Sequence, residues 1–264
     1  MLQIHSVSKT FAKGDINEKR ALDHVSLSLA EGEFVTIIGG NGAGKSTLLN
    51  CISGVYEIDE GRIILDGMDI SHTPEYKRSK YIGRVFQDPM LGTAYDMTIE
   101  ENLALAYGKG KPLGLGPGIR KKDLALFRDR LALLELGLED RLKGKVGLLS
   151  GGQRQALTLL MATIVKPKLL LLDEHTAALD PAIARKVLQL TRDIVAEERL
   201  CTMMITHNMK ASLEYGTRTL MMHEGKIILD IQGEERKHMT VERLIDQFGK
   251  KSGMELDNDR MLLN

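Results

Sequence analysis

A glycine-rich run around one lysine and two hydroxyl residues is the part of the chain best suited to chemistry. The run fits the spacing G-x-x-x-x-G-K-[ST], which is typical of loops that bind the phosphates of nucleoside triphosphates. Its members are Gly39, Gly40, Asn41, Gly42, Ala43, Gly44, Lys45, Ser46 and Thr47. Glycines let backbone N–H groups approach phosphate oxygens that a side chain would hold away. The pattern predicts that Lys45 reaches the β- and γ-phosphates and that the Ser46 hydroxyl binds Mg²⁺.

The residues on either side of this loop supply the context that the motif needs. Residues 34–38 are apolar and partly β-branched, which predicts a buried strand, and residues 48–52 continue from the loop as a helix. The start of a helix adds free N–H groups and the positive end of its dipole to an anion site. A glycine-rich turn with an incidental lysine is the alternative, and the flanking strand and helix argue against it.

A second stretch places two carboxylates directly after an apolar strand. Residues 169–172 are four leucines, which is typical of a strand buried in a parallel sheet, and Asp173 and Glu174 follow them. Alone, such a strand is weak evidence for a site. After a phosphate-binding loop, however, we expect Asp173 to face the Mg²⁺ beside Ser46, and Glu174 to orient or activate the attacking water.

The most specific motif is the run Leu149-Ser150-Gly151-Gly152-Gln153. An N-cap serine followed by a glycine turn would explain it locally. In order and spacing, however, the loop, this run and the acidic strand together resemble the ATP-binding-cassette (ABC) ATPases, whose signature sequence is LSGGQ. The resemblance covers about residues 2–230. It implies that Ser150, Gly151, Gly152 and Gln153 meet the γ-phosphate of an ATP held by a second copy of the chain, head to tail.

The resemblance implies roles for four more residues. Gln87 resembles the glutamine that contacts Mg²⁺ and water and signals to the membrane subunit, and His207 resembles the switch histidine that contacts the γ-phosphate. Asp180 lies in the run that resembles the loop linking two cassettes, and Phe11 resembles the aromatic residue that stacks on adenine. Taken singly, each has a plain structural explanation: an exposed glutamine, a turn aspartate, a strand-end histidine and a core phenylalanine.

The chain departs from the family pattern at several positions without losing a catalytic group. Gly40 and His175 stand where proline is usual, and Ala156 stands where arginine is common. Residues 159–162 lack the frequent Ala-Arg-Ala run. These departures indicate a distinct subfamily. It resembles the ATPases of bacterial binding-protein-dependent importers, some of which are linked to aromatic amino acids.

The chain of 264 residues predicts an α/β fold. We expect a phosphate-loop NTPase core with a mainly parallel sheet, an antiparallel β-subdomain near the N-terminus from strands at 2–7 and 22–29, and an inserted helical subdomain at about 88–155. Residues 1–240 are predicted to form one ATPase domain, and residues 241–264 a short C-terminal helix and tail. Within the helical region, helices are expected at 96–108 and 124–136. Residues 108–118 hold five glycines and two prolines, which predicts a surface loop.

Composition narrows the partners and the compartment. The 36 basic and 36 acidic residues balance, so no overall field draws nucleic acid or anionic lipid. Cys51 and Cys201 lie in apolar surroundings, which predicts buried, reduced thiols. The chain has neither a signal-peptide pattern at its start nor an apolar run of about 18 residues, so we expect a cytoplasmic protein and other chains to supply any membrane span.

The expected function is the ATPase subunit of a membrane transporter, with import favoured by the subfamily resemblance. The expected catalytic residues are Lys45, Glu174 and His207, and the expected metal ligands are Ser46, Gln87 and Asp173. The resemblance implies ATP and Mg²⁺ as cofactors. It implies as partners a second copy, a permease and a substrate-binding protein, and places the protein on the cytoplasmic face of the membrane.

Two alternatives remain. One is a soluble ABC ATPase of translation or DNA repair, although this chain has one cassette and residues 88–150 show no sustained heptads. The other is a nucleotide-binding regulator that never turns over, against which the full set of catalytic groups argues. Met90, Leu91, Tyr95 and Met97 are apolar or aromatic in a stretch that reads as surface. They predict either a partner site or a small core of the helical subdomain.

Overall fold

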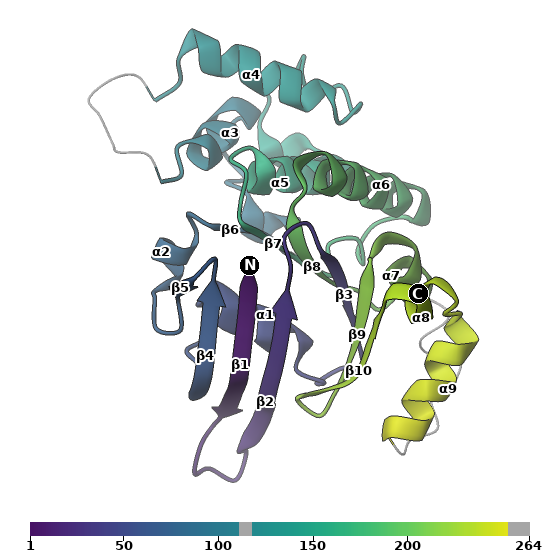
Figure 1. The fold of residues 1–264 in the computed structure, drawn as a ribbon. Helices are drawn as coiled ribbons and strands as arrows, with labels where there is room; N and C mark the ends of the chain where they lie inside the picture. Colours follow the sequence, from purple (N-terminus) through teal and green to yellow (C-terminus); the bar gives the residue numbers. More distant parts are fainter. Residues whose placement is uncertain (111–117, 253–264) are drawn as a thin grey trace.

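The structure, a computed structural model, describes residues 1–110 and 118–252. Two β-sheets lie on opposite sides of helix α1 (Lys45–Ser53), and a layer of further helices covers the outer face of the larger sheet (Figure 1). The buried residues Leu48 and Ile52 of α1 share one hydrophobic cluster with Ile4 of the first sheet and Val35 of the second. The helix that follows the phosphate loop is therefore fixed from both sides.

The first sheet is antiparallel, with strands in the order β2-β1-β4-β5. Its members are β1 (Leu2–Phe11), β2 (Lys19–Leu29), β4 (Glu60–Leu65) and β5 (Met68–Asp69). The predicted strands at 2–7 and 22–29 are confirmed as an antiparallel pair, and both are longer than expected. Leu2 and Ile4 are buried while Gln3 and His5 are exposed, as the period of a strand requires.

The second sheet has the order β10-β9-β3-β8-β7-β6. Its members are β3 (Phe34–Ile38), β6 (Ile82–Val85), β7 (Leu169–Asp173), β8 (Cys201–Ile205), β9 (Arg218–His223) and β10 (Lys226–Gln232). The pairs from β6 to β9 are parallel, and β10 is joined to β9 by an antiparallel hairpin, so the mainly parallel sheet is confirmed. Side chains of β3, β7 and β8 are almost all buried, because both faces of the sheet are covered.

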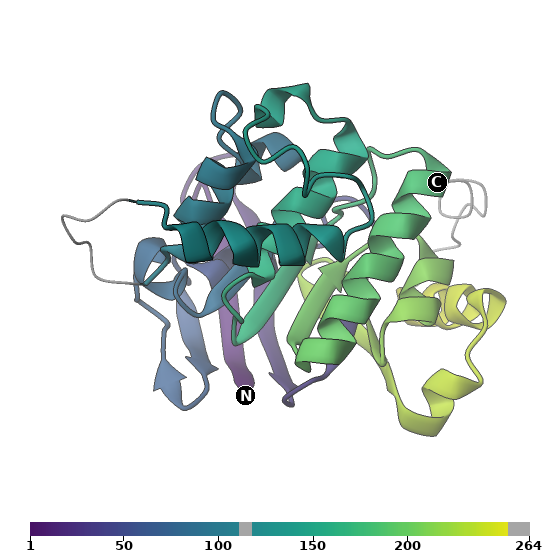
Figure 2. The ribbon, with the colours of Figure 1, turned by 90° about the horizontal axis from the view of Figure 1, so that it is seen from above.

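The helical layer consists of α3 (Ile99–Tyr107), α4 (Lys121–Ala132), α5 (Gly151–Thr163) and α6 (Pro181–Glu198) (Figure 2). A separate hydrophobic cluster joins α3, α4 and the first part of α5, with Phe127 and Leu103 fully buried in it. Leu159 and Ala162, further along α5, belong instead to a cluster with the sheet. This division is consistent with a helical subdomain, whose predicted limits of 88–155 stay a prediction, as do the limits 1–240 and 241–264.

The C-terminal part packs against the hairpin at the edge of the sheet. Helix α9 (Val241–Ser252) buries Leu244 and Phe248 in a cluster with Met221 of β9 and Leu229 of β10. The shorter helices are α2 (Glu75–Arg78), α7 (Met209–Tyr215) and α8 (Gly233–Lys237), and 3₁₀ turns η1 (Pro89–Gly92) and η2 (Val146–Leu148) flank α3 and α5. No helix in the described part of the chain is long and apolar enough to cross a membrane.

Several expectations need adjustment. Helix α4 begins at Lys121, three residues before the expected start, and α8 was not expected at all. Of the predicted surface loop at 108–118, residues 111–117 lie outside the described residues, as do residues 253–264 of the predicted C-terminal helix and tail. Cys51 and Cys201 are buried free thiols, as expected, and burial raises their pKa values to about 11 and about 12.

Candidate functional site

The candidate site lies at one edge of the second sheet, where parallel strands end side by side. The phosphate loop follows β3, Asp173 ends β7, and His207 follows β8 by two residues. The sheet order places β8 between β3 and β7, so segments separated by more than 120 residues meet at this edge. The crevice at the carboxyl ends of parallel strands is where open α/β sheets bind ligands.

The backbone of the phosphate loop requires glycine at two positions. Gly39 has φ 148°, and a Cβ there would stand 2.3 Å from the carbonyl oxygen of Met222. Gly44 has φ 100°, and a Cβ there would stand 2.4 Å from the carbonyl oxygen of Ala21. At Gly40 a Cβ would meet nothing within 4 Å, so the proline usual at this position would be accommodated at Cβ. The loop is thus held between β2, β9 and α1.

Lys45 places a buried cation inside the loop. The residue is 5% exposed, and its Nζ donates to the carbonyl oxygens of Gly39 at 2.9 Å and Gly40 at 3.0 Å. Burial lowers the pKa of Lys45, and the nearby carboxylates of Glu174 and Asp173 oppose that shift. A desolvated ammonium at the start of a helix suits a strongly anionic ligand such as a triphosphate.

Asp173 and Ser46 meet as the motif analysis expected. The Ser46 hydroxyl donates to Asp173 Oδ1 at 3.2 Å, across the junction between α1 and β7. Burial raises the pKa of Asp173, while the hydrogen bond from Ser46 and the charge of Arg84 oppose the rise. A hydroxyl and a carboxylate are the hard oxygen ligands that Mg²⁺ takes from a protein when phosphates and water supply the rest. The described residues contain no cluster of three or more His, Cys, Asp or Glu side chains that would hold a metal by itself.

Glu174 and His207 form the second contact of the site. Glu174 Oε1 lies 2.6 Å from Nε2 of His207. The hydrogen bond from His207 is the main reason that the pKa of Glu174 is lowered, so the carboxylate is held ionised and able to accept a proton. Glu174 has the unusual φ of 45°, and its N–H donates to the carbonyl oxygen of Ile205, which fixes where the side chain leaves the backbone.

The signature run is built as a helix start. Ser150 is the N-cap of α5: its hydroxyl accepts from the Gln153 N–H at 3.3 Å, and Gln153 Oε1 accepts from the Ser150 N–H at 3.2 Å. Gly152 is required by packing, because a Cβ there would stand 2.2 Å from Cγ2 of Ile183 in α6. Ser150 and Gly151 are exposed. Within the described residues, no hydrogen bond joins the signature run to the phosphate loop of the same chain.

Within the described part of the chain, no side-chain hydrogen bond or ion pair joins the remaining predicted residues, Gln87, Asp180 and Phe11, to Lys45, Ser46, Asp173, Glu174 or His207. Gln87 is exposed after β6, and Asp180 is exposed at the start of α6. Phe11, at the end of β1, is partly buried and packs edge to face on Tyr56, with ring centroids 5.1 Å apart. The structure therefore brings together Lys45, Ser46, Asp173, Glu174 and His207. The roles of Gln87, Asp180, Phe11 and the signature run stay predictions.

Two more side chains near the site were not expected to take part in it. Arg84 of β6 lies 3.8 Å from Asp173, between their Nη2 and Oδ2 atoms. His175 is 2% exposed, and its Nε2 lies 3.1 Å from the Thr191 hydroxyl, which itself donates to a helix carbonyl. Burial lowers the pKa of His175 to about 4, so this ring is neutral. The sequence gives one indication that Arg84 has a special role, because it is a charged residue inside an otherwise apolar strand.

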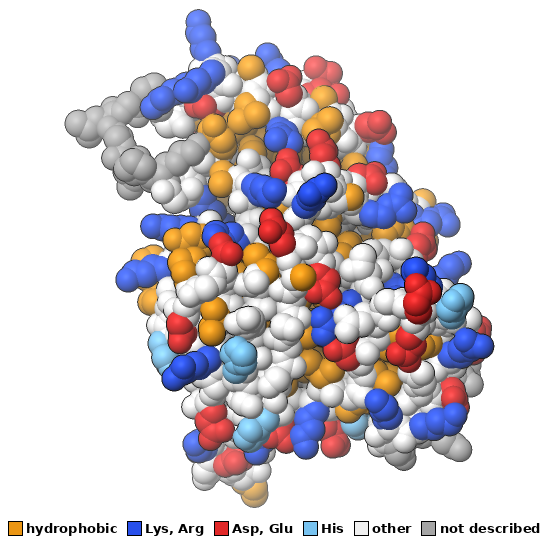
Figure 3. All heavy atoms as spheres, in the orientation of Figure 1, with side chains coloured by type: hydrophobic (Ala, Val, Ile, Leu, Met, Phe, Trp, Pro, Cys, Tyr) orange, Lys and Arg blue, Asp and Glu red, His pale blue; other side chains and the backbone are white. Residues whose placement is uncertain are grey.

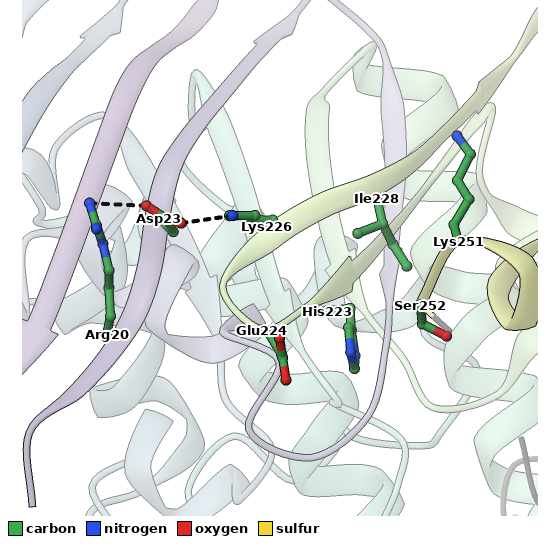
Figure 4. A pocket seen from close by; sticks show the side chains of 8 residues that line it. All are labelled: Arg20, Asp23, His223, Glu224, Lys226, Ile228, Lys251 and Ser252. Carbon is green, nitrogen blue, oxygen red and sulfur yellow. Dashed lines mark ion pairs between the residues drawn. The ribbon is translucent and has the colours of Figure 1, made fainter. Parts of the chain in front are cut away.

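Two cavities flank the site. One of about 530 Å³ lies beside the β9–β10 hairpin and is lined by charged residues of β2, the hairpin and α9. Figure 4 shows Asp23 in it between Arg20 and Lys226, each 3.0 Å away, so these three charges are paired. The other, of about 290 Å³, is a groove between the sheet and the helical layer, lined by Arg84, Phe86, Leu91 and Lys109 among others.

Comparison with known proteins agrees with this geometry. The sequence profile of the family described as ABC transporter matches residues 22–177. The chain belongs to the ABC transporter family, as an ATP-binding subunit. It is 47% identical to a tyrosine transport ATP-binding protein of Clostridioides difficile (strain R20291), over 94% of this chain and 98% of that relative. It is 35% identical to a phosphonates import ATP-binding protein of Alcaligenes faecalis, over 87% of this chain and 82% of that relative.

A solved structure agrees in fold as well. This ABC subunit matches a dimeric ATP-binding cassette in a post-hydrolysis state, bound to ADP and Pi, with a TM-score of 0.75 and 28% identity. The match covers 88% of this chain and 98% of that structure. The predicted family and fold class are thus confirmed, and so is the expectation of an ATPase that hydrolyses ATP for transport. A role in translation or DNA repair is not supported.

Proposed function

We propose that this ABC subunit powers an importer as a pair of identical copies attached to a membrane permease. The observation that carries the proposal is the meeting of two contacts at one sheet edge: Ser46 with Asp173, and Glu174 with His207. Each contact joins residues from segments that are far apart in the sequence, so the arrangement is a product of the fold and not of local sequence. Together with Lys45, it provides an anion grip and an ionised base in one place.

The chain's own residues account for binding and for water activation. Lys45 exchanges its two carbonyl acceptors for the β- and γ-phosphates of ATP, while the N–H groups of Gly42, Gly44 and Ser46 surround them. Glu174 accepts a hydrogen bond from the attacking water and takes its proton as the bond to the γ-phosphorus forms. His207 keeps the Glu174 carboxylate oriented and contacts the γ-phosphate.

Ser46, Asp173 and Gln87 are the residues that would hold Mg²⁺. When bound, the ion neutralises phosphate charge that builds up as the β–γ bond breaks. The residues present fit that ion because they offer only oxygen donors, and because the Asp173 carboxylate already points Oδ1 at the Ser46 hydroxyl.

The exposed start of α5 is proposed to complete the site of a second copy. Ser150 and Gly151 present a helix N-terminus to solvent, and a γ-phosphate held by the partner's loop would satisfy its free N–H groups. The dimeric form of the similar cassette bound to ADP and Pi supports this arrangement. Asp180 would lie in the contact between copies.

The permease is proposed to dock on the helical layer. Large hydrophobic side chains are exposed in this layer and in the segment that leads into α3, and Figure 3 shows hydrophobic side chains over the upper part of the molecule as well as elsewhere on this face. Met90 is 49%, Leu91 70% and Tyr95 46% exposed, which favours a partner site over a small internal core for these three residues. Such docking would hold the protein on the cytoplasmic face of the membrane.

The proposed cargo is tyrosine or a similar aromatic amino acid, delivered by a substrate-binding protein. The name of the relative at 47% identity supports this cargo, and the phosphonate relative at 35% identity offers the alternative. Uptake of labelled tyrosine and of a labelled phosphonate by vesicles that hold the protein with its permease and binding protein would decide between them. Uptake of neither compound would reject both cargoes.

The paired arrangement is tested by Glu174→Gln. The amide keeps size and hydrogen bonding but cannot take a proton, so ATP is bound and not consumed. We expect a stable dimer in size-exclusion chromatography with ATP and Mg²⁺, and a monomer with ADP. A variant that binds ATP yet stays monomeric at high concentration, with and without the permease, would contradict the proposal.

A further inference from the structure

Arg84 is a mostly buried cation that the proposed mechanism does not use. Its side chain is 12% exposed and extends from β6 towards α1. Nη2 donates to Asn50 Oδ1 at 2.6 Å, and Nη1 donates to the Ser53 hydroxyl at 3.1 Å. Both acceptors belong to the helix that begins at the phosphate loop. Arg84 thus ties the sixth strand to the helix under the candidate ATP site.

The same guanidinium faces the carboxylate proposed to bind Mg²⁺. Asp173 divides its two oxygens: Oδ1 accepts from Ser46, and Oδ2 lies 3.8 Å from Nη2 of Arg84. A cation on one side and a hydroxyl on the other leave the carboxylate little freedom to turn. Groups that hold a metal ligand in this way tune metal affinity although they do not touch the metal.

Arg84 is also continuous with the groove beneath the helical layer. Its guanidinium carbon lies 4.5 Å from the ring centroid of Phe86, the residue before Gln87. Arg84 and Phe86 line the groove of about 290 Å³ together with Leu91, one of the exposed residues of the proposed docking surface. Among the described residues Nε of Arg84 has no hydrogen-bond acceptor. A buried guanidinium with an unused donor costs stability, so its role has to be sought outside stability.

We propose that Arg84 is a positioning residue that links the groove to the Mg²⁺ carboxylate. It fixes Asp173 for the ion, and because it stacks on Phe86, displacement of the groove wall by a docked permease changes the placement of both Asp173 and Gln87. The inference rests on the proposed function, since the groove matters here as a permease site. Lysine cannot replace this residue, because only the planar fork of arginine reaches α1 and Asp173 at once.

The test compares Arg84→Met with wild type in two measurements. Calorimetry with a non-hydrolysable ATP analogue gives the affinity without Mg²⁺ and then with it, so the increase in affinity due to Mg²⁺ is measured without turnover. We expect Mg²⁺-free affinity to be unchanged and the gain from Mg²⁺ to fall about ten-fold or more. The second measurement is the stimulation of ATPase activity by the permease in vesicles, which should be lost. Arg84→Lys should behave as Arg84→Met does.

Arg78 supplies the matched control. It is a buried arginine at the C-terminal end of α1, 2% exposed, and its hydrogen-bond partners within the described residues are backbone carbonyls, including those of Cys51 and Ile52. Arg78→Lys should lower the melting temperature and leave both Mg²⁺ gain and permease stimulation as in wild type. If Mg²⁺ raised nucleotide affinity equally poorly in the Arg84 and Arg78 variants, the role of Arg84 would be structural only.

The outcomes separate this inference from the proposed function. If the permease stimulates the ATPase activity of wild type and of Arg84→Met alike, and Mg²⁺ raises the nucleotide affinity of both proteins equally, the inference is wrong and the proposed function stands. If wild type shows no permease-dependent activity, the importer proposal fails. The calorimetric arm still decides whether Arg84 positions Asp173.

Discussion

The phosphate-loop edge of the sheet and the signature end of α5 differ in how they satisfy their polar groups. At the sheet edge, Lys45, Asp173 and Glu174 are largely buried and their pKa values are shifted: Lys45 bonds to carbonyls of its own loop, and the two carboxylates bond to distant segments. At the signature end, Ser150 and Gln153 bond to each other, Gln153 Nε2 also donates to the carbonyl oxygen of Leu136 at 3.4 Å, and Ser150 is exposed to solvent. Shifted pKa values are typical of a reaction site whose groups are already arranged in the free protein. An exposed helix N-terminus is instead a surface that can bind an anion.

Helix α5 connects these two regions mechanically. Its start carries the signature, while Leu159 and Ala162 near its end pack on the sheet that carries Asp173. The contact with β6 is close, since a Cβ at Gly83 would stand 2.5 Å from the carbonyl oxygen of Ala162. A helix so anchored moves with the sheet edge. We therefore expect changes at the nucleotide to reach the signature as a rigid displacement.

The largest effect is expected from Lys45→Ala. Removal of the buried ammonium leaves the β- and γ-phosphate charge without its counter-charge, so kcat/KM for ATP should fall by about 100-fold or more. Phosphate release and nucleotide binding by a single chain measure the loss. Lys166→Ala, which changes an exposed lysine away from the loop, is the control and should keep wild-type activity. Wild-type hydrolysis by Lys45→Ala would mean that the nucleotide lies elsewhere.

Ser150→Arg tests the signature end of α5. If the signature acts only on the partner's nucleotide, ATP binding to a single chain should stay within about two-fold of wild type. Turnover should fall by roughly 100-fold, since a bulky side chain displaces the γ-phosphate contact. In the Glu174→Gln background the same change should abolish the ATP-dependent dimer. A dimer that persists in the double variant would place the interface away from the signature.

Ser150→Thr is the matched control, because threonine keeps the N-cap hydroxyl of α5. The dimer and turnover should survive that change. Equal losses of turnover and of the dimer in Ser150→Thr and Ser150→Arg would show that the start of α5 tolerates no change of side chain. The effect of arginine could then not be attributed to a lost γ-phosphate contact.

The sequence predicted those parts of the molecule that depend on local patterns. The phosphate loop, the leucine strand and the helix start at Ser150 each follow from residues near one another in the chain. Contacts between distant segments could not be predicted in this way. Arg84 is one charge in an apolar strand, and only the order of strands in the sheet brings it close to Asp173. His175 stood out as a replacement for proline, but its bond to Thr191 follows from the packing of α6 on β7.

The pH dependence of stability is the third way to test the difference between the two regions. The folded pKa of His175, about 4, lies below its ordinary value of 6.5 because the ring is buried. Between these values the unfolded chain binds a proton that the folded chain does not, so stability falls as pH decreases through this window. The full contribution, about 3 kcal/mol, is present above pH 6.5 and is lost by about pH 4.

Urea unfolding at several pH values measures this contribution, with His175→Gln as the reference. The variant should show a shallower loss of stability between pH 6.5 and 4, and the difference between the two proteins isolates the histidine from the carboxylates. The signature end contributes nothing in this window, because Ser150 and Gln153 do not titrate. Parallel curves for the two proteins would show that His175 is protonated in the fold.

The smallest effect concerns the helical cluster around α3. Thr98 closes a capping box: its hydroxyl accepts from the Glu101 N–H at 3.3 Å, and its own N–H donates to Glu101 Oε2 at 2.7 Å. Thr98→Ala should cost about 1 kcal/mol of helix stability. Because Ile99 and Leu103 pack in the helical cluster and not in the sheet clusters, the loss should stay local. Hydrogen exchange should quicken in α3 and α4 while β7, β8 and the affinity for ATP remain unchanged.

Thr163→Ala is the control for this change. The Thr163 hydroxyl bonds to carbonyls within its own helix, α5, and caps no helix start, so its loss should quicken exchange less than the loss of Thr98. If Thr98→Ala also loosened β7 or weakened ATP binding, the helical layer and the sheet edge would unfold as one unit. The signature would then be tied to the nucleotide through the stability of the whole layer, and the anchored end of α5 would not be the main connection.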